Sequence, residues 1–268
     1  MNLFKKAIFF TDIHFGLKSN SRTHNQDCLD FVDFVIKTGK EQNCETCVFL
    51  GDWHNNRASL QIGTLNYSVQ AIDKLSAAFD QIIFIPGNHD EHYRDTREMN
   101  SVVWAKKYEN VRLFDEITTV DDVCITPWLV GDEHKQIKKV EAKYMFGHFE
   151  LPSFYMNAMV QMPDVGDLRR DDLKCETVFT GHFHKRQTSK NITYIGNAFP
   201  HNYADVGDDD RGCMVLDWGK DPVYIPWPDA PKYRKFRLSE ILEDTDRLLL
   251  SNMYCRVEID VDISYEEA

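Results

Sequence analysis

Short apolar runs recur along the first two thirds of the chain, and polar residues follow each of them at once. The runs are rich in β-branched and aromatic residues, which is typical of buried strands. They occupy residues 7–10, 47–50, 81–85, 143–146 and 177–180. Four of the five carry a glycine at or just after their end, which permits a sharp exit and a close approach of backbone to a ligand.

Helical periodicity separates the first three runs. Apolar side chains recur three or four positions apart in residues 26–40, where Gly39 should end the helix, and again in residues 60–79. Strand–helix–strand alternation predicts a largely parallel sheet, which binds ligands at the carboxyl ends of its strands. The polar residues after the five runs should therefore converge in one place.

Further strand-like segments indicate a second sheet packed on the first. They lie at residues 111–114, 123–126, 193–195, 213–216 and 223–225. The expected fold class is therefore α/β. We find no internal repeat and no low-complexity segment.

The amino-acid composition is that of an ordinary globular protein. Hydrophobic residues are 43% and charged residues 28% of the 268 residues, which excludes a disordered or collagen-like chain. A net charge of −12 argues against a basic coat for nucleic acid, although a local basic groove remains compatible with it. The apolar run 7–10 is too short for a secretory signal, and no run reaches the roughly 18 residues of a transmembrane helix. We therefore expect a cytoplasmic protein without a membrane partner.

Two smaller features have ordinary interpretations. The seven cysteines are irregularly spaced and include one close pair, Cys44 and Cys47, so we expect free, reduced thiols. The acidic run 208–210 is expected to be a solvated turn.

Histidines concentrate at the ends of the five runs. Seven of the ten lie in or beside them: His14, His54, His89, His92, His148, His182 and His184. Imidazole with carboxylate and amide oxygens suits manganese, iron, zinc or cobalt. The donors are too many for one ion, and a carboxylate can bridge two ions that activate a hydroxide for phosphate displacement. The sequence therefore predicts a dinuclear metal site.

These motifs resemble the five blocks of the calcineurin-like metallophosphoesterases, in order and across residues 12–184. The blocks are Asp12-x-His14, Gly51-Asp52, Gly87-Asn88-His89-Asp90, Gly147-His148 and Gly181-His182-Phe183-His184. The resemblance implies a two-sheet β-sandwich flanked by helices, in four layers. It also implies that Asp12, His14 and His184 hold one ion, that Asn88, His148 and His182 hold the other, and that Asp52 bridges them. By the same resemblance His89 is the catalytic histidine, and Asp90 orients it.

Within this family the chain is most similar to the SbcD-type DNA repair nucleases, especially phage-encoded ones. The resemblance lies in residues 12–16, 147–152, 194–197 and 205–217. It implies a DNA endo- and exonuclease that acts in repair and recombination through a metal-bridged hydroxide, as the partner of an SbcC-like ATPase. Manganese is the expected metal, with magnesium, iron or zinc as alternatives, and a homodimer stays open.

Several residues near the expected mouth of the site are candidate substrate contacts. We assign this role to His54, Arg57, Tyr93, Phe183 and Lys185. A single residue, Trp53, separates Asp52 from His54, whereas such nucleases usually have one residue more. His54 is therefore expected beside the site, not as a ligand. Phe183 and Tyr93 could stack on a base or pack beneath the loops.

Three other functions stay open. A phosphoprotein phosphatase would need a different pattern after Asp52, where this chain has Trp53-His54-Asn55-Asn56-Arg57. A small-molecule or cyclic-nucleotide phosphodiesterase would share all five blocks. A non-catalytic scaffold is disfavoured because no ligand is missing.

The chain is expected to divide at residue 228. Residues 1–228 form the metallophosphoesterase nuclease domain, and residues 229–268 form a linker, a helix and a strand at the start of a C-terminal capping region. Ser239 is the expected cap of a helix at 239–250, and residues 254–263 alternate like a half-buried strand. We expect that strand to pair back on the core, to be poorly ordered or to pair with a second copy. We also expect the chain to end just inside the capping region.

Overall fold

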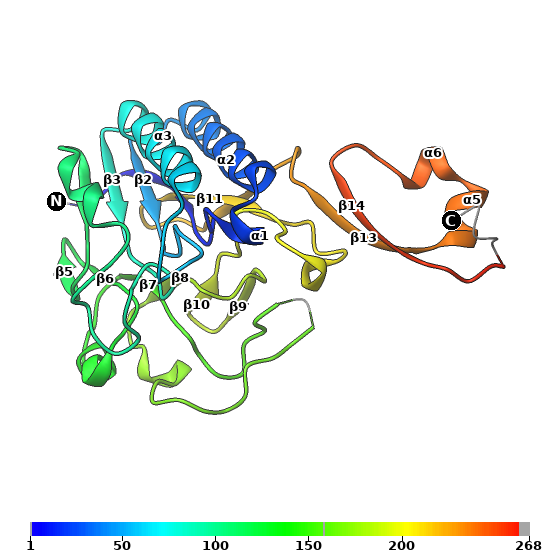
Figure 1. Cartoon of the computed structure of the whole chain (residues 1–268). Helices are drawn as coiled ribbons and strands as arrows, with labels where there is room; N and C mark the ends of the chain where they lie inside the picture. The colour runs from blue at the N-terminus through cyan, green and yellow to red at the C-terminus, as the bar shows by residue number, and fades with distance from the viewer. Residues whose placement is uncertain (1, 158, 263–268) are drawn as a thin grey trace.

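The computed structural model describes residues 2–157 and 159–262. Two six-stranded sheets lie face to face, and a small two-stranded sheet projects to one side (Figure 1). Both large sheets are mixed, and the two-sheet α/β arrangement confirms the expected fold class.

The first sheet has its four parallel strands in chain order. Its strand order is β12-β11-β1-β2-β3-β4, in which β11 is antiparallel to β1 and to β12. The strands are β1 (Lys6–Phe10), β2 (Thr46–Phe49), β3 (Gln81–Phe84), β4 (Val111–Leu113), β11 (Gly212–Asp217) and β12 (Val223–Pro226).

The second sheet contains the remaining two ligand-bearing strands. Its order is β5-β6-β7-β8-β10-β9, with β6, β7, β8 and β10 parallel. The strands are β5 (Thr118–Val120), β6 (Val123–Thr126), β7 (Tyr144–His148), β8 (Thr177–Gly181), β9 (Gln187–Ser189) and β10 (Ile192–Tyr194).

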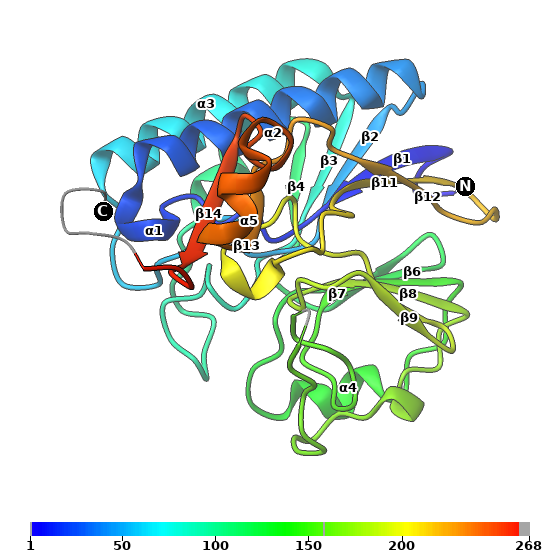
Figure 2. The same ribbon diagram turned by 90° about the vertical axis from the view of Figure 1, so that its right-hand side faces the viewer.

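This arrangement corrects the predicted division of the strands. The five ligand-bearing runs were expected in one sheet, but β1–β3 belong to the first sheet and β7–β8 to the second. Conversely, β4, β11 and β12 join the first sheet. The five carboxyl ends still face the same edge of the molecule, because the two sheets lie face to face there (Figure 2).

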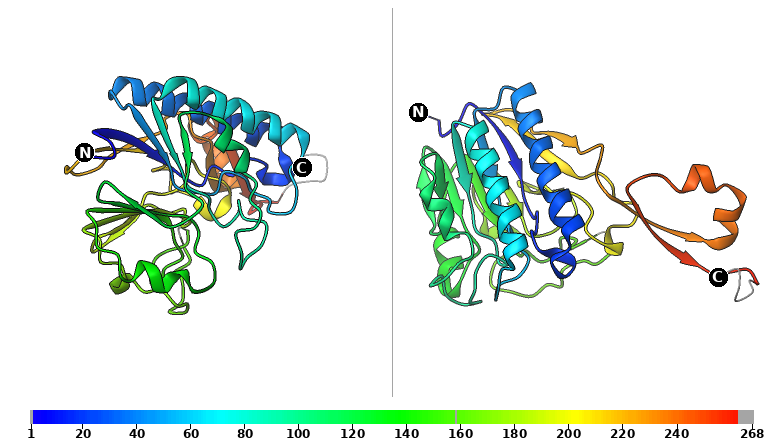
Figure 3. Two further views of the ribbon diagram at one scale, coloured as in Figure 1. Left: turned by 90° about the vertical axis from the view of Figure 1, so that its left-hand side faces the viewer. Right: turned by 45° about the horizontal axis from the view of Figure 1, so that its top comes forward.

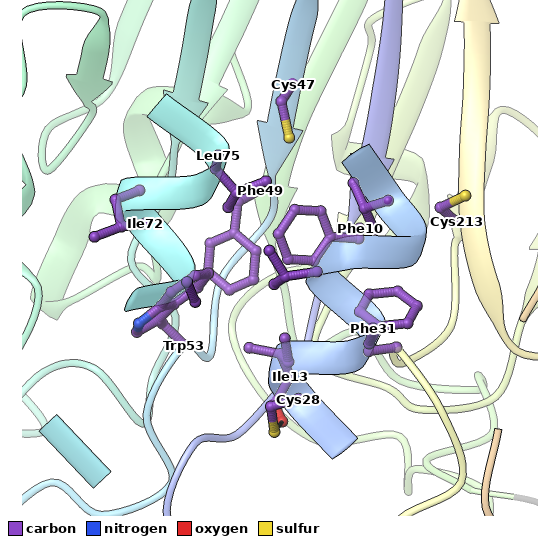
Figure 4. Close-up of a cluster of buried hydrophobic side chains, with 14 of the residues drawn as sticks. Phe10, Ile13, Cys28, Phe31, Cys47, Phe49, Trp53, Ile72, Leu75 and Cys213 are labelled. Atoms are coloured by element: carbon purple, nitrogen blue, oxygen red, sulfur yellow. Dashed lines mark hydrogen bonds between the residues drawn. The ribbon is translucent and has the colours of Figure 1, made fainter. Parts of the chain in front are cut away.

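Two long helices cover the outer face of the first sheet (Figures 1 and 3). Helix α2 (Arg22–Glu41) begins where the Ser21 side chain accepts the His24 N–H, and α3 is Ile62–Ala78. Gly39 does not end α2 as predicted, since the helix continues to Glu41. Its role is in packing: a Cβ at this position would come within 2.7 Å of the Phe79 ring, so glycine allows the helix to approach that ring closely. The aromatic core beneath these helices includes Phe10, Phe49 and Trp53 (Figure 4).

The space between the sheets is filled by a second aromatic cluster. Phe9 from β1 meets Phe146 from β7 edge to face, with ring centroids 5.0 Å apart. Val48 and Ile83 add aliphatic side chains from β2 and β3. This dry layer fixes the two sheets against each other and therefore fixes the strand ends that carry the site.

The far face of the second sheet has a thin cover. It consists of loops, the short helix α4 (His134–Ile137) and 3₁₀ turns, packed on Cys124, Met145 and Val178. The order helix, sheet, sheet, cover makes the four expected layers. Of the helices that the structure describes, none is both long and apolar enough to cross a membrane.

The C-terminal segment forms a small unit of its own. Strands β13 (Lys232–Arg237) and β14 (Met253–Glu258) pair in parallel, joined through α5 (Leu238–Glu243) and α6 (Thr245–Leu248). The predicted linker thus contains a strand, and the predicted single helix is two short ones. Ser239 is not a cap: its N–H and hydroxyl bond Asp260. The last strand ends at Glu258, before the predicted 263, and Ile263 lies outside the described residues.

Candidate metal centre

The ends of five strands bring a set of metal-donor side chains together. Asp12 and His14 follow β1, Asp52 follows β2, and Asn88 and His89 follow β3. His148 ends β7, while His182 and His184 follow β8. A hollow of about 150 Å³ opens among them, lined by His14, Asp52, His89, His182 and His184.

Asp52 lies in the middle of this set. Its Oδ2 is 3.7 Å from His14 Nε2 and 3.4 Å from His148 Nε2. Its Oδ1 accepts the backbone N–H of His89 at 2.8 Å. One carboxylate oxygen therefore faces donors from both sheets, as a bridging ligand would.

The other donors form one group on each side of Asp52. Asp12, His14 and His184 offer ligand atoms that lie within 4.8 Å of one another, and so do Asp52, His148 and His182. Asn88 joins the second group, because its Oδ1 lies 3.1 Å from His148 Nε2 and 2.9 Å from His182 Nδ1. The assignment of these groups to two ions stays a prediction.

Several donors sit on strained backbone. Asp12, His14, Asp52 and His182 have φ angles of 50°, 53°, 62° and 88°. This left-handed region costs a residue with a Cβ on the order of 1–3 kcal/mol. Such strain concentrates at functional sites, where packing around the loop maintains it. Gly51 shows how tight that packing is, since a Cβ there would approach His148 Nδ1 to 2.3 Å.

Hydrogen bonding prepares His148 to bind metal. Its Nδ1–H donates to the Leu50 carbonyl at 2.7 Å, which directs Nε2 toward Asp52. Burial opposes a charge on His148, but the Asp52 carboxylate raises its pKa to about 9. Asp52 is buried too, yet His148 holds the pKa of Asp52 well below its usual range. A cation at this position would replace that proton.

His14 tests whether the site fits a metal. Both its ring nitrogens are buried without a hydrogen-bond partner among the described residues. Burial lowers its pKa well below the ordinary value, against the pull of Asp52, so the ring is neutral. His14 Nε2 lies 3.8 Å from Asp12 and 3.7 Å from Asp52, too far for a hydrogen bond, and a cation among them would satisfy all three groups, so the donor set fits divalent metal.

His89 is placed beside the donors, but Asp90 does not orient its ring as expected. The Nδ1–H of His89 donates to the Asn55 carbonyl at 2.7 Å, and its ring centroid lies 4.9 Å from that of His14. Asp90 is buried and accepts the backbone N–H groups of Trp53, His54 and Gly87. It therefore joins the loops after β2 and β3. Burial and the nearby Asp52 raise its pKa to about 7.

Two of the expected substrate contacts are enclosed by protein. His54 has no exposed surface, and its ring nitrogens bond Ser101 and Ser68 at 2.8 and 2.9 Å. Phe183 is buried and stacks on Tyr194 with centroids 4.8 Å apart. Neither ring offers a face to a substrate, because both turn inward from the loops that carry the donors.

The other three expected contacts are accessible. Tyr93 is 41% exposed, and Lys185 is half-buried with its Nζ 4.9 Å from the Tyr155 ring centre. Arg57 is half-buried, and its Nη1 has no hydrogen-bond partner among the described residues. These three stay candidates for substrate contact.

Two histidines that sequence reasoning passed over support the strained loop 12–14. His201 Nε2 donates to the Asp12 carbonyl at 2.8 Å, and His24 Nε2 donates to the His14 carbonyl at 3.0 Å. The His201 ring also packs edge-on against the rings of His14 and His184, with centroids 5.5 and 5.3 Å away. Each stands alone in the sequence, so only its burial in three dimensions reveals it.

The two-sheet sandwich and its cluster of carboxylate, amide and imidazole donors are the features of a metal-dependent phosphoesterase. The sequence profile described as calcineurin-like phosphoesterase matches residues 5–186. The chain therefore belongs to the calcineurin-like phosphoesterase family.

Individual proteins are similar to different degrees. "Exonuclease subunit 1" of Enterobacteria phage T4 is 29% identical over 222 residues, which are 79% of this chain and 64% of the phage protein. This chain thus spans less than two thirds of that relative. Among solved structures, the Pseudomonas putida nuclease MPE matches with a TM-score of 0.35 and 16% identity, over 67% of this chain and 62% of its own. The E. coli phosphoesterase Yfce matches with a TM-score of 0.42 and 14% identity, over 84% of this chain and 94% of its own. At these scores neither structure carries an argument about function.

Proposed function

We propose that this protein is a metal-dependent DNA nuclease that hydrolyses phosphodiester bonds at a dinuclear centre. The observation that carries the proposal is the position of Asp52 Oδ2 between His14 Nε2 and His148 Nε2. In this proposal Asp12, His14 and His184 would hold one ion, Asn88, His148 and His182 would hold the other, and Asp52 would serve both. Two such ions would polarise the phosphate and lower the pKa of a bound water.

The chain's own groups complete the chemistry. His89 is the proposed general acid: its Nδ1–H is held by the Asn55 carbonyl, so the protonated ring would give the proton on its Nε2 to the leaving oxygen. Asp90 keeps the loops after β2 and β3 in register and so positions Asp52 and His89. Arg57, Lys185 and Tyr93 contact the DNA chain, the first two through phosphate and the third by stacking.

The biological setting is part of the same proposal. The T4 relative is called an exonuclease subunit, which supports a multi-subunit nuclease. We infer an SbcC-like ATPase partner, a role in DNA repair and recombination, manganese as the working metal and a cytoplasmic location, that of the host if the protein is phage-encoded. The unit from residue 229 onward is the start of the capping region through which such a nuclease holds duplex DNA. A homodimer is compatible with this arrangement.

A nuclease assay tests the proposal directly. Single- and double-stranded DNA, labelled at either end, is incubated with Mn²⁺, Mg²⁺ or EDTA, with and without an SbcC-like ATPase. We expect metal-dependent release of nucleotides that EDTA abolishes and that the ATPase stimulates on duplex DNA. The labelled ends distinguish endonuclease from exonuclease action and give its polarity.

The same assay separates the alternatives. Hydrolysis of bis(p-nitrophenyl) phosphate or cyclic nucleotides without cleavage of DNA would identify a small-molecule phosphodiesterase. Release of phosphate from a phosphopeptide would identify a phosphatase. Metal binding with no hydrolysis of any of these substrates would identify a scaffold.

A further inference from the structure

A second hollow adjoins the metal cluster. It measures about 230 Å³, and its lining includes Trp128, Leu129, His148, Glu150 and Leu168. His148 belongs both to this lining and to the donor set. A molecule in the hollow would therefore lie next to a phosphate held at the cluster.

Trp128 connects the hollow to the cluster. Its ring centroid lies 5.0 Å from that of His182 and 6.1 Å from that of His148. Its backbone N–H donates to the Pro86 carbonyl at 3.0 Å, two residues before Asn88. The half-buried indole thus has a fixed position relative to the donors, and it forms an aromatic part of the wall of the hollow.

The carboxylates that line the hollow favour the base of a nucleotide over its phosphate. The described residues that line it include no lysine or arginine; they include the carboxylates of Glu150 and Asp167 and the imidazoles of His134 and His148. Glu150 Oε1 lies 3.6 Å from His182 Nε2, so this carboxylate stands where the hollow meets the donor cluster. Two carboxylates repel a phosphate but accept hydrogen bonds from the amino group of a base. Leu129 and Leu168 add apolar surface that suits the ring of a base.

We propose that this hollow binds the base of the nucleotide whose phosphate lies at the metal cluster, by stacking it on Trp128. The proposal rests on the nuclease function and deepens it, because it names the part of the substrate that the site recognises. A base can enter the hollow only after it leaves the stack of its neighbours. The reacting end of the substrate is therefore an unpaired nucleotide.

A pair of small substrates tests the subsite without a requirement for DNA binding. One is deoxycytidine 5′-(p-nitrophenyl phosphate), and the other is the same ester of deoxyribose without a base. Stacking of one base contributes about 1–3 kcal/mol, so the wild-type KM should be roughly 5- to 150-fold lower for the substrate with the base. Trp128→Ala should remove most of this difference between the two KM values. Trp128→Phe should keep part of it.

Trp218→Ala is the matched control, because Trp218 is also a half-buried tryptophan but packs on Phe4 and Tyr144. It should lower the Tm without changing the ratio of the two KM values. Trp128→Leu retains apolar volume without an aromatic face and replaces Trp128→Ala if that variant does not fold. Equal KM values for both substrates in the wild type, or a ratio that survives Trp128→Leu, would overturn the subsite. Failure of the wild type to hydrolyse either substrate would instead overturn the proposed function.

Discussion

The core and the C-terminal unit place similar strands in opposite surroundings. In the core, β1 and β2 have neighbours on both sides and aromatic layers on both faces. In the C-terminal unit, β13 and β14 pair only with each other among the described residues, and Val257 on β14 and Ile259 just after it are 43% and 63% exposed. A parallel pair is normally covered on both faces, so the unit relies on its contacts with the core in the part of the chain that the structure describes.

Those contacts are few and gather at one end of the unit. Lys18 donates to the Tyr233 hydroxyl and lies 4.4 Å from the centre of the Tyr254 ring. Arg234 forms a pair with Asp209, with Nη1 2.9 Å from Oδ1. Asp209 belongs to the acidic run that was expected to be a solvated turn, but each of its three carboxylates pairs with an arginine. Tyr203 of the core also packs on Tyr233 and lies under Arg256. The site therefore depends on the core, while a small set of polar and aromatic contacts at the junction holds the C-terminal unit.

Among these substitutions, Asp52→Asn should have the largest effect on hydrolysis and metal binding. The change removes negative charge between donors of both sheets, so we expect loss of hydrolysis and of at least one bound metal ion. Asp260→Asn makes the same substitution in the C-terminal unit, where the carboxylate bonds Ser239, and should leave both unchanged. Elemental analysis that finds two full-occupancy ions in Asp52→Asn would refute the bridging role.

His89→Ser should have the next largest effect. A general acid contributes about 10²–10⁴-fold to the rate, so hydrolysis should fall by roughly that factor. Metal content and DNA binding should not change, because His89 is proposed to serve the leaving oxygen and not an ion. Loss of metal on this substitution would move His89 into the ligand set.

Substitutions in the core and in the C-terminal unit should differ clearly in their cost in unfolding free energy. Phe49 is fully buried against Phe10 and Phe84, so Phe49→Ala should cost about 3–5 kcal/mol of unfolding free energy. Val257→Ala, on the exposed strand, should cost within about 0.5 kcal/mol. Urea denaturation measures both values. A comparable cost at Val257 would mean that a partner covers that face in solution.

A smaller effect is expected from the histidine that supports the loop 12–14. His201→Ala should weaken one of two Mn²⁺-binding events by about 10- to 100-fold, as is typical when a residue behind a metal ligand is lost. His201→Gln keeps an N–H donor near the position of Nε2 and should restore much of the affinity. Titration calorimetry measures both binding events.

Asn110→Ala provides the control for His201. It removes side-chain bonds to the Ser76 and Phe79 carbonyls at the opposite end of the first sheet. It should lower stability and leave Mn²⁺ binding intact. If His201→Ala behaves in the same way, its role is structural only.

The smallest effect should come from the junction itself. Arg234→Ala removes a partly exposed ion pair, which contributes about 0.2–1 kcal/mol, so the Tm of the core should barely move. Limited proteolysis between residues 226 and 262 should accelerate nonetheless, because the unit is then held by fewer contacts. An unchanged rate of cleavage would show that Lys18 and the tyrosines suffice.

Local pattern predicted the strands and donors well but could not predict which strands are neighbours. An apolar run followed by Asp or His is visible in the sequence, so the positions of Asp12, Asp52 and His148 were all found. The pairing of β11 with β1 joins residues from opposite ends of the core, and local pattern could not show that β4 adds to β3 in the first sheet. His54 and Phe183 follow donors in the sequence and were expected to contact the substrate, but both side chains are buried. The left-handed backbone at Asp52 and His182 turns the chain there, so residues close in sequence face different sides. His24 and His201 lack any nearby motif.

The order of strands in the first sheet has a consequence for how the chain folds. Strand β1, the first to be synthesised, lies between β2 and β11, and its register pairs Lys6 with Asp217. Such distant pairings slow folding, because the entropy of closing a long loop opposes them before they contribute stability. During synthesis, β1 would emerge long before β11 and expose one unpaired edge in the meantime. The donors after β8 are also made late, so a metal ion can complete its coordination only when nearly the whole core has been synthesised.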